Sequence, residues 1–224
     1  MKIKGAIFDM DGTLIDSLMY WEDLYRRIGK KYFNDESFHP SQEVDKTIRH
    51  MIFAEAISNL KDHYNIPGTT DELLEFCEKG IPEFYRNIAK LKDGAITLLE
   101  DLKSKNIKLC LASATDINHV KIALEHHGIA KYFDCVLSCA QIGVGKHEPD
   151  IFLLALSELG VSANEVCVFE DSVVGLGTAK RIGCYTVGIF DKYNSNHESL
   201  KAISDIYLKE GESLATLCEK ITKE

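Results

Sequence analysis

The sequence predicts an α/β fold: a doubly wound, Rossmann-like parallel-sheet core domain with an inserted helical-bundle cap domain. Short apolar runs rich in Val, Ile and Phe alternate with longer segments of helical period, which is typical of strands joined by crossover helices. Between the first two runs, residues 17–91 show helical period and almost no strand signal. Acidic residues directly follow two of the runs. The alternation of short apolar runs with helical segments favours a parallel sheet covered by helices.

The core domain is predicted from residues 1–16 together with residues 92–224. Six short apolar runs in these segments have the composition of buried strands, at residues 4–8, 107–112, 135–138, 166–169, 185–189 and 206–208. A last helix at residues 213–220 is expected to pack on the sheet.

Residues 17–91 are predicted to form the cap. Two sets of apolar residues recur at spacings of three and four, which places each set on one helix face: Trp21, Leu24, Tyr25 and Ile28, and Ile48, Ile52, Ala56 and Leu60. Pro67 and Gly68, followed by Thr70 and Asp71, indicate a turn and a helix start. Because two connections tether this segment to the core, we expect hinged motion over the sheet.

The composition is that of a globular protein, which we expect to be cytoplasmic. The chain has 224 residues, of which 45% are hydrophobic, enough for a substantial core. Its formal net charge of -9 repels nucleic acid, which is therefore not an expected partner. No apolar run reaches the roughly 18 residues of a membrane span, and no leader precedes the first strand pattern, so no membrane association is expected. The seven scattered cysteines are expected to be reduced.

The first candidate site lies in GAIFDMDGTLIDS, where Asp9 and Asp11 follow an apolar run. In open α/β sheets, ligands bind at the carboxyl ends of the strands. Carboxylates buried together need a cation or a shared proton, so the pair predicts a binding site. A simple strand-to-loop turn is the alternative, because Asp and Gly are common turn residues.

A second acidic pair, Glu170 and Asp171, directly follows another buried-type strand. Since the carboxyl ends of parallel strands lie at one edge of a sheet, both acidic sites could surround one hard cation. We expect Mg²⁺, because it binds few protein carboxylates and takes its other ligands from water and phosphate. Asp171 or Ser172 could also cap the next helix, and both roles can coexist.

A third candidate site follows the strand at residues 107–112. Two hydroxyl side chains and several backbone amides stand just before a helix that starts near Asp116. Helix N-termini bind anions, so Ser113 and the amide of Ala114 are candidate phosphate ligands. Ser113 and Thr115 could instead act only as helix caps.

Lys146 lies in GVGKHEPDIF, a loop with two glycines before a helix that Pro149 opens. Its ammonium would offset the charge of carboxylates and phosphate together. A solvated surface lysine is the alternative, since most lysines are exposed. The spacing differs from that of a nucleotide-binding P-loop, which has GxxxxGK followed by Ser or Thr.

These four motifs, DMDGT, the Ser of LASAT, the Lys of GKHEPD and FEDS, resemble those of the haloacid dehalogenase (HAD) superfamily in type and in order. The resemblance covers the whole chain. The insertion after the first motif is similar to the cap of the β-phosphoglucomutase-like branch. This resemblance implies a Mg²⁺-dependent phosphatase that hydrolyses a small phosphomonoester, such as a sugar phosphate or a similar metabolite.

The resemblance also implies a role for each motif residue. Asp9 would attack phosphorus and form an aspartyl-phosphate. Asp11 would protonate the departing alkoxide and later deprotonate water, while its backbone carbonyl would bind the metal. The phosphoryl oxygens would be held by Ser113, Ala114 and Lys146. The metal ligands would come from Asp9, Asp11, Glu170 and Asp171.

Three positions bear on the choice between related reactions. Dehalogenases of this superfamily lack the general acid, so Asp11 favours phosphoryl chemistry. Known β-phosphoglucomutases carry a histidine where Trp21 stands and a residue other than threonine at the position of Thr13, so hydrolysis is favoured. His147 stands where proline usually follows the motif lysine. A sugar-phosphate mutase and a non-catalytic phosphate-metabolite-binding module on the same fold stay open as alternatives.

The cap is expected to supply specificity for the leaving group. Four of its basic residues could reach a substrate: Arg26, Lys30, Arg49 and His50. A solvated helix face is the favoured interpretation for each. Tyr20 and Trp21 could line the pocket, although core packing is favoured for them. The expected assembly is a monomer or a weak dimer.

Overall fold

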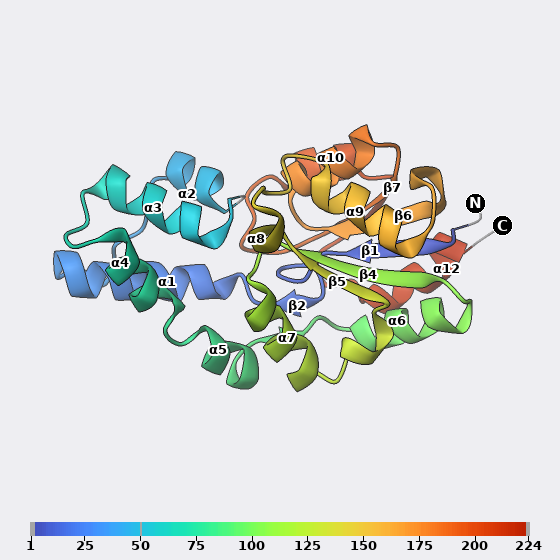
Figure 1. Ribbon diagram of the computed structural model, residues 1–224, viewed down its shortest axis with the longest axis horizontal. Coiled ribbons are helices and arrows are strands. Elements are labelled where there is room, and N and C mark those ends of the chain that lie inside the picture. Colours follow the sequence, from blue (N-terminus) through green and yellow to red (C-terminus); the bar gives the residue numbers. More distant parts are fainter. Residues whose placement is uncertain (1–2, 50, 223–224) are drawn as a thin grey trace.

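The computed structural model describes residues 3–49 and 51–222. Its centre is a six-stranded sheet in which every neighbouring pair of strands is parallel (Figure 1). In spatial order the strands are β5 (Cys135–Ser138), β4 (Lys108–Ser113), β1 (Gly5–Phe8), β6 (Val166–Glu170), β7 (Tyr185–Ile189) and β8 (Ile206–Leu208). The chain builds one half from β1 to β5 and then returns to build β6 to β8 on the other side of β1. The predicted doubly wound topology is confirmed.

All six predicted strands are present, with bounds shifted by one residue at several ends. The most useful shifts are at two carboxyl ends. Ser113 pairs with Ser138 and is the last residue of β4, while Glu170 pairs with Gly188 and is the last residue of β6. The sequence prediction ended both strands one residue earlier. Because the strand pairing extends to Ser113 and Glu170, both residues lie directly at the carboxyl edge of the sheet.

The sheet is buried on both faces because successive side chains point in opposite directions. Ile7 packs into one hydrophobic cluster and its neighbours Ala6 and Phe8 into another. The first cluster is completed by helices α9 (Asp150–Leu159) and α10 (Val173–Arg181). The second is completed by α6 (Ala95–Ser104), α7 (Ile117–His126) and α12 (Leu217–Thr222) (Figure 1). The remaining core helices are α8 (Cys139–Ile142), α11 (His197–Ile203) and the 3-10 turns at Ala130–Tyr132, Ala163–Glu165 and Leu214–Thr216.

The segment between the first two core strands is helical, as predicted, but the apolar set of Ile48, Ile52, Ala56 and Leu60 does not lie on one helix, because one helix ends at Ile48 and the next begins at Phe53. It contains α1 (Met19–Ile28), a π-helical turn at Gly29–Phe33, α2 (Gln42–Ile48), α3 (Phe53–Tyr64), α4 (Thr70–Glu78) and α5 (Ile81–Asn87). Helices α1 to α4 enclose a hydrophobic cluster of their own, which includes Leu24, Tyr25, Ile48 and Leu60. Thr69 and Glu72 form a capping box at the start of α4, close to the predicted helix start.

Helix α5 packs differently from the four helices before it. It lies against α7 (Figure 1), and its Ile81, Phe84 and Tyr85 belong to the cluster under the sheet. Two-residue strands β2 (Ile15–Asp16) and β3 (Lys90–Leu91), which the sequence did not predict, pair antiparallel where the helical segment leaves and rejoins the core. The domain boundaries at 16/17 and 91/92 stay a prediction.

Three further expectations concern the C-terminus, the membrane and the cysteines. The predicted last helix is present as a 3-10 turn followed by α12, which packs against α6. Within the described residues, no helix combines the length and the apolar character that crossing a bilayer requires. None of the seven cysteines, all of which lie within the described residues, forms a disulfide bond.

Candidate active site

The candidate active site lies at the carboxyl edge of the sheet, where β1, β4 and β6 end side by side. Asp9 follows β1, and its backbone amide donates to the carbonyl of Phe169 on β6 at 3.0 Å. Glu170 ends β6 and Ser113 ends β4 on the other side of β1. Residues that are more than one hundred positions apart in the chain therefore converge at one place.

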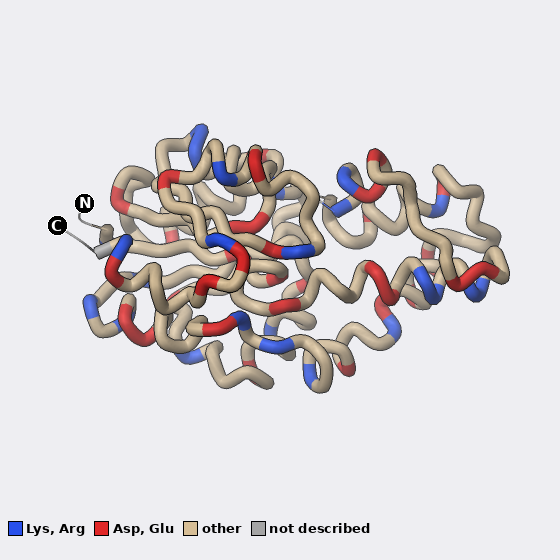
Figure 2. The backbone as a smooth tube through the Cα atoms, turned by 180° about the vertical axis from the view of Figure 1, so that it is seen from behind, with Lys and Arg blue, Asp and Glu red and all other residues tan. Residues whose placement is uncertain are grey.

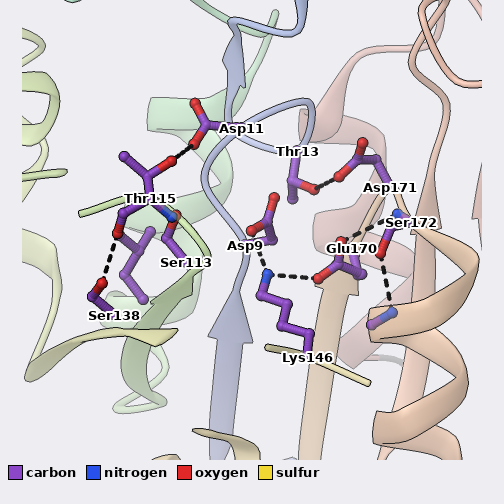
Figure 3. Close-up of polar contacts among 12 residues, drawn as sticks. Asp9, Asp11, Thr13, Ser113, Thr115, Ser138, Lys146, Glu170, Asp171 and Ser172 are labelled. Carbon is purple, nitrogen blue, oxygen red and sulfur yellow. Dashed lines mark hydrogen bonds and ion pairs between the residues drawn. The ribbon is translucent and has the colours of Figure 1, made fainter. Parts of the chain in front are cut away.

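Three carboxylates form the centre of the site. Asp9, Glu170 and Asp171 are buried, and each offers an oxygen that lies within 4.8 Å of the other two. Lys146 is buried beside them and donates to Asp9 and, at 2.7 Å, to Glu170 (Figure 3). The alternative of a solvated lysine is therefore wrong for Lys146.

The electrostatics of this carboxylate cluster show a deficit of positive charge. Burial, opposed by Lys146 and reinforced by the other carboxylates, raises the pKa of Asp9 to about 7. Burial together with the charges of Glu170 and Asp9 raises the pKa of Asp171 well above its usual value. Burial disfavours the charge of Lys146, but Asp9 and Glu170 outweigh it and raise the pKa of that ammonium. One ammonium cannot balance three buried carboxylates, so the oxygen donors fit a divalent cation.

Asp171 is held in place from two directions. Thr13 donates to it at 3.1 Å, and the side-chain amide of Asn194 donates to its other oxygen. Gly12 passes so close that an added Cβ would lie 2.4 Å from Asp171 Oδ2, and its φ of +83° is a conformation that glycine adopts readily. The cap of α10 is Ser172, which accepts from the amide of Gly175 at 3.0 Å. Asp171 therefore points its carboxylate to the cluster and leaves capping to its neighbour.

The Asp11 side chain does not join the carboxylate cluster, contrary to the expectation that four acidic residues surround one cation. Its carboxylate accepts hydrogen bonds from Ser17 at 2.6 Å, Tyr85 at 2.7 Å and Thr115 at 2.7 Å. In Figure 3 it points away from Lys146 and toward Thr115. Three hydroxyl donors outside the cluster hold it there. A metal contact through its backbone carbonyl stays a prediction.

The predicted phosphate-binding segment lies next to Asp11. Ser113 is buried and accepts from the amide of Thr115 at 3.1 Å, while Asp116 accepts from Asn118 and caps α7. Neither Ser113 nor Thr115 caps that helix, so the capping alternative is wrong for both. Ser113 and Ala114 line the same cleft as the carboxylate cluster.

The backbone at His147 attaches the loop that carries Lys146 to the core, a contact that proline at this position could also make because it keeps its carbonyl. The backbone carbonyl of His147 accepts from Thr178 at 3.2 Å and from Arg181 at 2.9 Å, both on α10. The loop is thus attached to the helix that follows Glu170 and Asp171.

A cleft of about 1140 Å³, part of it open to solvent, connects the carboxylate cluster with the helical segment. The wall opposite the carboxylates is mainly apolar and is lined by Tyr20, Trp21, Met51, Phe53, Ile81 and Phe84. Tyr20 and Trp21 pack against other aromatic rings and also line the cleft. Both interpretations of these two residues therefore apply.

Arg49 also lines the cleft, and the interpretation of a solvated helix face is wrong for it. Only 9% of its side chain is exposed, and it donates to Asp45 at 2.8 Å and to Glu22 at 2.9 Å. Arg26 and Lys30 are exposed, as expected. His50 lies outside the described residues.

Two residues of the site could not be found from the sequence. Tyr85 follows Phe84 on an apolar helix face and has the pattern of a core residue. Asn194 lies in a polar loop after β7 with no motif spacing to any acidic residue. Both reach the site through contacts with distant parts of the chain, at Asp11 and Asp171.

Comparison with known proteins gives a consistent result at the level of the family. The family model of haloacid dehalogenase-like hydrolases matches residues 3–183. A phosphorylated carbohydrates phosphatase of Thermotoga maritima is 29% identical over 97% of this chain and 99% of its own length. Validoxylamine A 7'-phosphate phosphatase of Streptomyces hygroscopicus subsp. limoneus is also 29% identical, over 92% of this chain and 93% of its own.

Solved structures of the same fold cover nearly the whole chain. A putative beta-phosphoglucomutase from Thermotoga maritima superposes with a TM-score of 0.75 at 27% identity, covering 99% of this chain and 100% of its own. CbbY from Rhodobacter sphaeroides, in complex with phosphate, gives a TM-score of 0.80 at 22% identity and covers 96% of each chain.

Proposed function

The chain belongs to the haloacid dehalogenase-like hydrolases, and from this premise we propose that it hydrolyses a small phosphomonoester through Asp9 with the aid of Mg²⁺. It is a phosphoric monoester hydrolase, in keeping with its phosphatase relatives. The observation that carries the proposal is the buried contact of Lys146 with both Asp9 and Glu170 in the cleft. A sugar phosphate or similar metabolite is the proposed substrate, since one relative acts on phosphorylated carbohydrates.

The proposed reaction divides one difficult displacement into two easier ones. Asp9 attacks phosphorus to form an aspartyl-phosphate, and water then hydrolyses this ester. Asp11 gives a proton to the departing alkoxide and takes one from the water. Lys146, Ser113 and the amide of Ala114 hold the phosphoryl oxygens.

The carboxylate cluster is the proposed metal site. Asp9, Glu170 and Asp171 supply side-chain oxygens, and the backbone carbonyl of Asp11 is a further proposed ligand. A bound Mg²⁺ would supply the positive charge that keeps these carboxylates ionised and that offsets the charge of the phosphoryl group. Asn194 and Thr13 would orient Asp171 toward it.

The proposed setting is a cytoplasmic enzyme, monomeric or weakly dimeric, that acts on a metabolite and not on nucleic acid or a membrane. The net charge of -9 supports this view. Figure 2 shows basic and acidic residues intermixed along the backbone of the described residues.

A screen of phosphomonoesters at fixed Mg²⁺ tests the proposal. Sugar phosphates, nucleotides and phosphoglycolate are compared by the phosphate they release, with wild type, Asp9→Asn and Asp62→Asn. We expect turnover for the wild type and for Asp62→Asn, whose carboxylate is exposed on α3, and loss of at least about a thousandfold for Asp9→Asn. Normal turnover by Asp9→Asn would exclude Asp9 as the nucleophile. No turnover of any ester, with phosphate analogues still bound, would indicate a binding module.

A sugar-phosphate mutase is the second candidate, because one structure of the same fold is described as a putative beta-phosphoglucomutase. The mutase keeps the same nucleophile but returns the phosphoryl group to a sugar. Trp21 lines the cleft where such mutases carry a histidine, which favours water as the acceptor. If a bisphosphorylated sugar accelerates isomerisation of the monophosphate and is not merely hydrolysed, the protein is a sugar-phosphate mutase.

A further inference from the structure

Three hydroxyl groups converge on the carboxylate of Asp11. Ser17 and Tyr85 donate to Oδ1 at 2.6 and 2.7 Å, and Thr115 donates to Oδ2 at 2.7 Å. These donors come from three separate segments: the residues after β2, helix α5 and the loop after β4. Because both oxygens have partners, rotation of the carboxyl group requires that at least one hydrogen bond breaks.

Tyr85 is fixed by the packing of its ring, unlike Ser17, which is equally buried but has no ring to pack. Tyr85 is 5% exposed, its ring packs edge-on against Phe84 at 5.7 Å, and it belongs to the hydrophobic cluster under the sheet. Helix α5 packs on α7, whose N-terminus adjoins the Ser113 loop. The hydroxyl of Tyr85 is therefore held by the core and not by the separate cluster of α1 to α4.

The hydroxyl of Tyr85 is the donor in its contact with Asp11. A phenol carries one proton and an ionised carboxylate has only acceptor oxygens, so the tyrosine supplies the proton of this 2.7 Å bond.

We propose that Tyr85 is a positioning residue that aims the Asp11 carboxyl at the leaving oxygen of the substrate. The inference rests on the proposed function, in which Asp11 protonates that oxygen. Asp11, Tyr85 and Thr115 all line the cleft, so the carboxyl is presented to the space that the substrate occupies. Proton transfer depends on the distance and orientation of the donor, so a carboxyl that is free to rotate transfers its proton less often.

The test compares two leaving groups in the Tyr85→Phe variant. An alkyl phosphate needs a proton on its leaving oxygen, whereas p-nitrophenolate departs without one. We expect kcat/KM for the best alkyl substrate to fall about tenfold and kcat/KM for p-nitrophenyl phosphate to change less than about twofold. Because kcat/KM reports only the steps up to phosphoryl transfer, hydrolysis of the aspartyl-phosphate does not affect it.

Tyr132→Phe is the matched control. Tyr132 also donates to a carboxylate, that of Glu100 at 2.8 Å, and it is nearly buried, but it does not line the cleft. This variant should keep the wild-type ratio of alkyl to aryl turnover. Asp11→Asn should lower the same ratio more than Tyr85→Phe does, because it removes the acid itself.

The ratio of the two substrates is measured in one sample, so partial unfolding lowers both rates and leaves the ratio unchanged. If Tyr85→Phe keeps the wild-type ratio of alkyl to aryl turnover while Asp11→Asn lowers it, the proposed role of Tyr85 is overturned and that of Asp11 is not. Turnover by Asp9→Asn would overturn the proposed function instead. A rise in alkyl turnover in Tyr85→Phe would also overturn the inference, since Tyr85 would then restrain the acid.

Discussion

At the scale of single residues, the site depends on carboxylates that are expensive to bury together. Burial raises the pKa of Asp9 to about 7 although Lys146 contacts it, so burial outweighs the ion pair. The uncompensated charge explains why a cation is expected at this place and not elsewhere on the acidic surface. The chain tolerates this cost at the residues that are proposed to carry the chemistry.

The pKa of Asp9 predicts how the stability of the metal-free protein depends on pH. Its value is about 7 in the folded chain and 3.8 as the reference for an exposed group, so folding takes up a proton between these values. The contribution of Asp9 is fully present below about pH 4 and is lost as the pH rises through about 7, by at most about 1.4 kcal/mol per pH unit.

Urea unfolding in a chelator at about pH 5 and about pH 8 measures this contribution. The wild type should lose more stability over this interval than Asp9→Asn, which has no carboxyl group to titrate there. The comparison with this variant is needed because the raised pKa of Asp171 also makes the stability depend on pH. An equal loss in both proteins would show that Asp9 has an ordinary pKa.

At the scale of elements, helix α10 is shaped to receive Glu170. A Cβ added at Gly175 would lie 2.6 Å from Glu170 Oε2 and 2.7 Å from its Cδ. Two residues further along the same helix, a Cβ at Gly177 would meet only Ile203 at 3.9 Å, an ordinary contact. The first glycine therefore serves the site, and nothing in the packing requires the second.

Gly175→Ala should displace the Glu170 carboxylate from Lys146 and from the proposed metal site. We expect kcat to fall at least about tenfold and the Mg²⁺ concentration for half activation to rise. Gly177→Ala should keep normal activity and gain up to about 1 kcal/mol of stability from helix propensity. Activity titrated with Mg²⁺ and urea unfolding provide the two measurements; identical kinetics for both variants would contradict this role of Gly175.

The elements also show where sequence reasoning works. All six strands of the sheet were predicted because each is a short and mainly apolar run, and Asp9, Glu170 and Ser113 follow from their places at strand ends. The pair β2 and β3 was missed because two-residue strands have no periodicity. Helix propensity and apolar stripes predict that residues 17–91 are helical. They do not predict which of these helices packs on the core.

At the scale of the whole molecule, the cleft joins two hydrophobic clusters that fold around different elements. The sheet edge provides the carboxylates, and the helical segment provides an apolar wall with Arg49 beside it. Tyr85 and Asn194 could not be found from the sequence, and Arg49 was expected to be solvated, because the environment of all three depends on contacts between distant segments. The sequence thus predicts the proposed reacting groups better than the residues that contact them.

The central claim is that Asp9 becomes phosphorylated during turnover, and trapping the ester tests it most directly. The enzyme is quenched rapidly while it hydrolyses a phosphomonoester in the presence of Mg²⁺. Borohydride then reduces any aspartyl-phosphate to homoserine. Peptide mass spectrometry then locates the modified residue. The account predicts homoserine at residue 9 in the wild type and none in the absence of substrate. Turnover without homoserine at this position, or with the modification at another carboxylate, would contradict it.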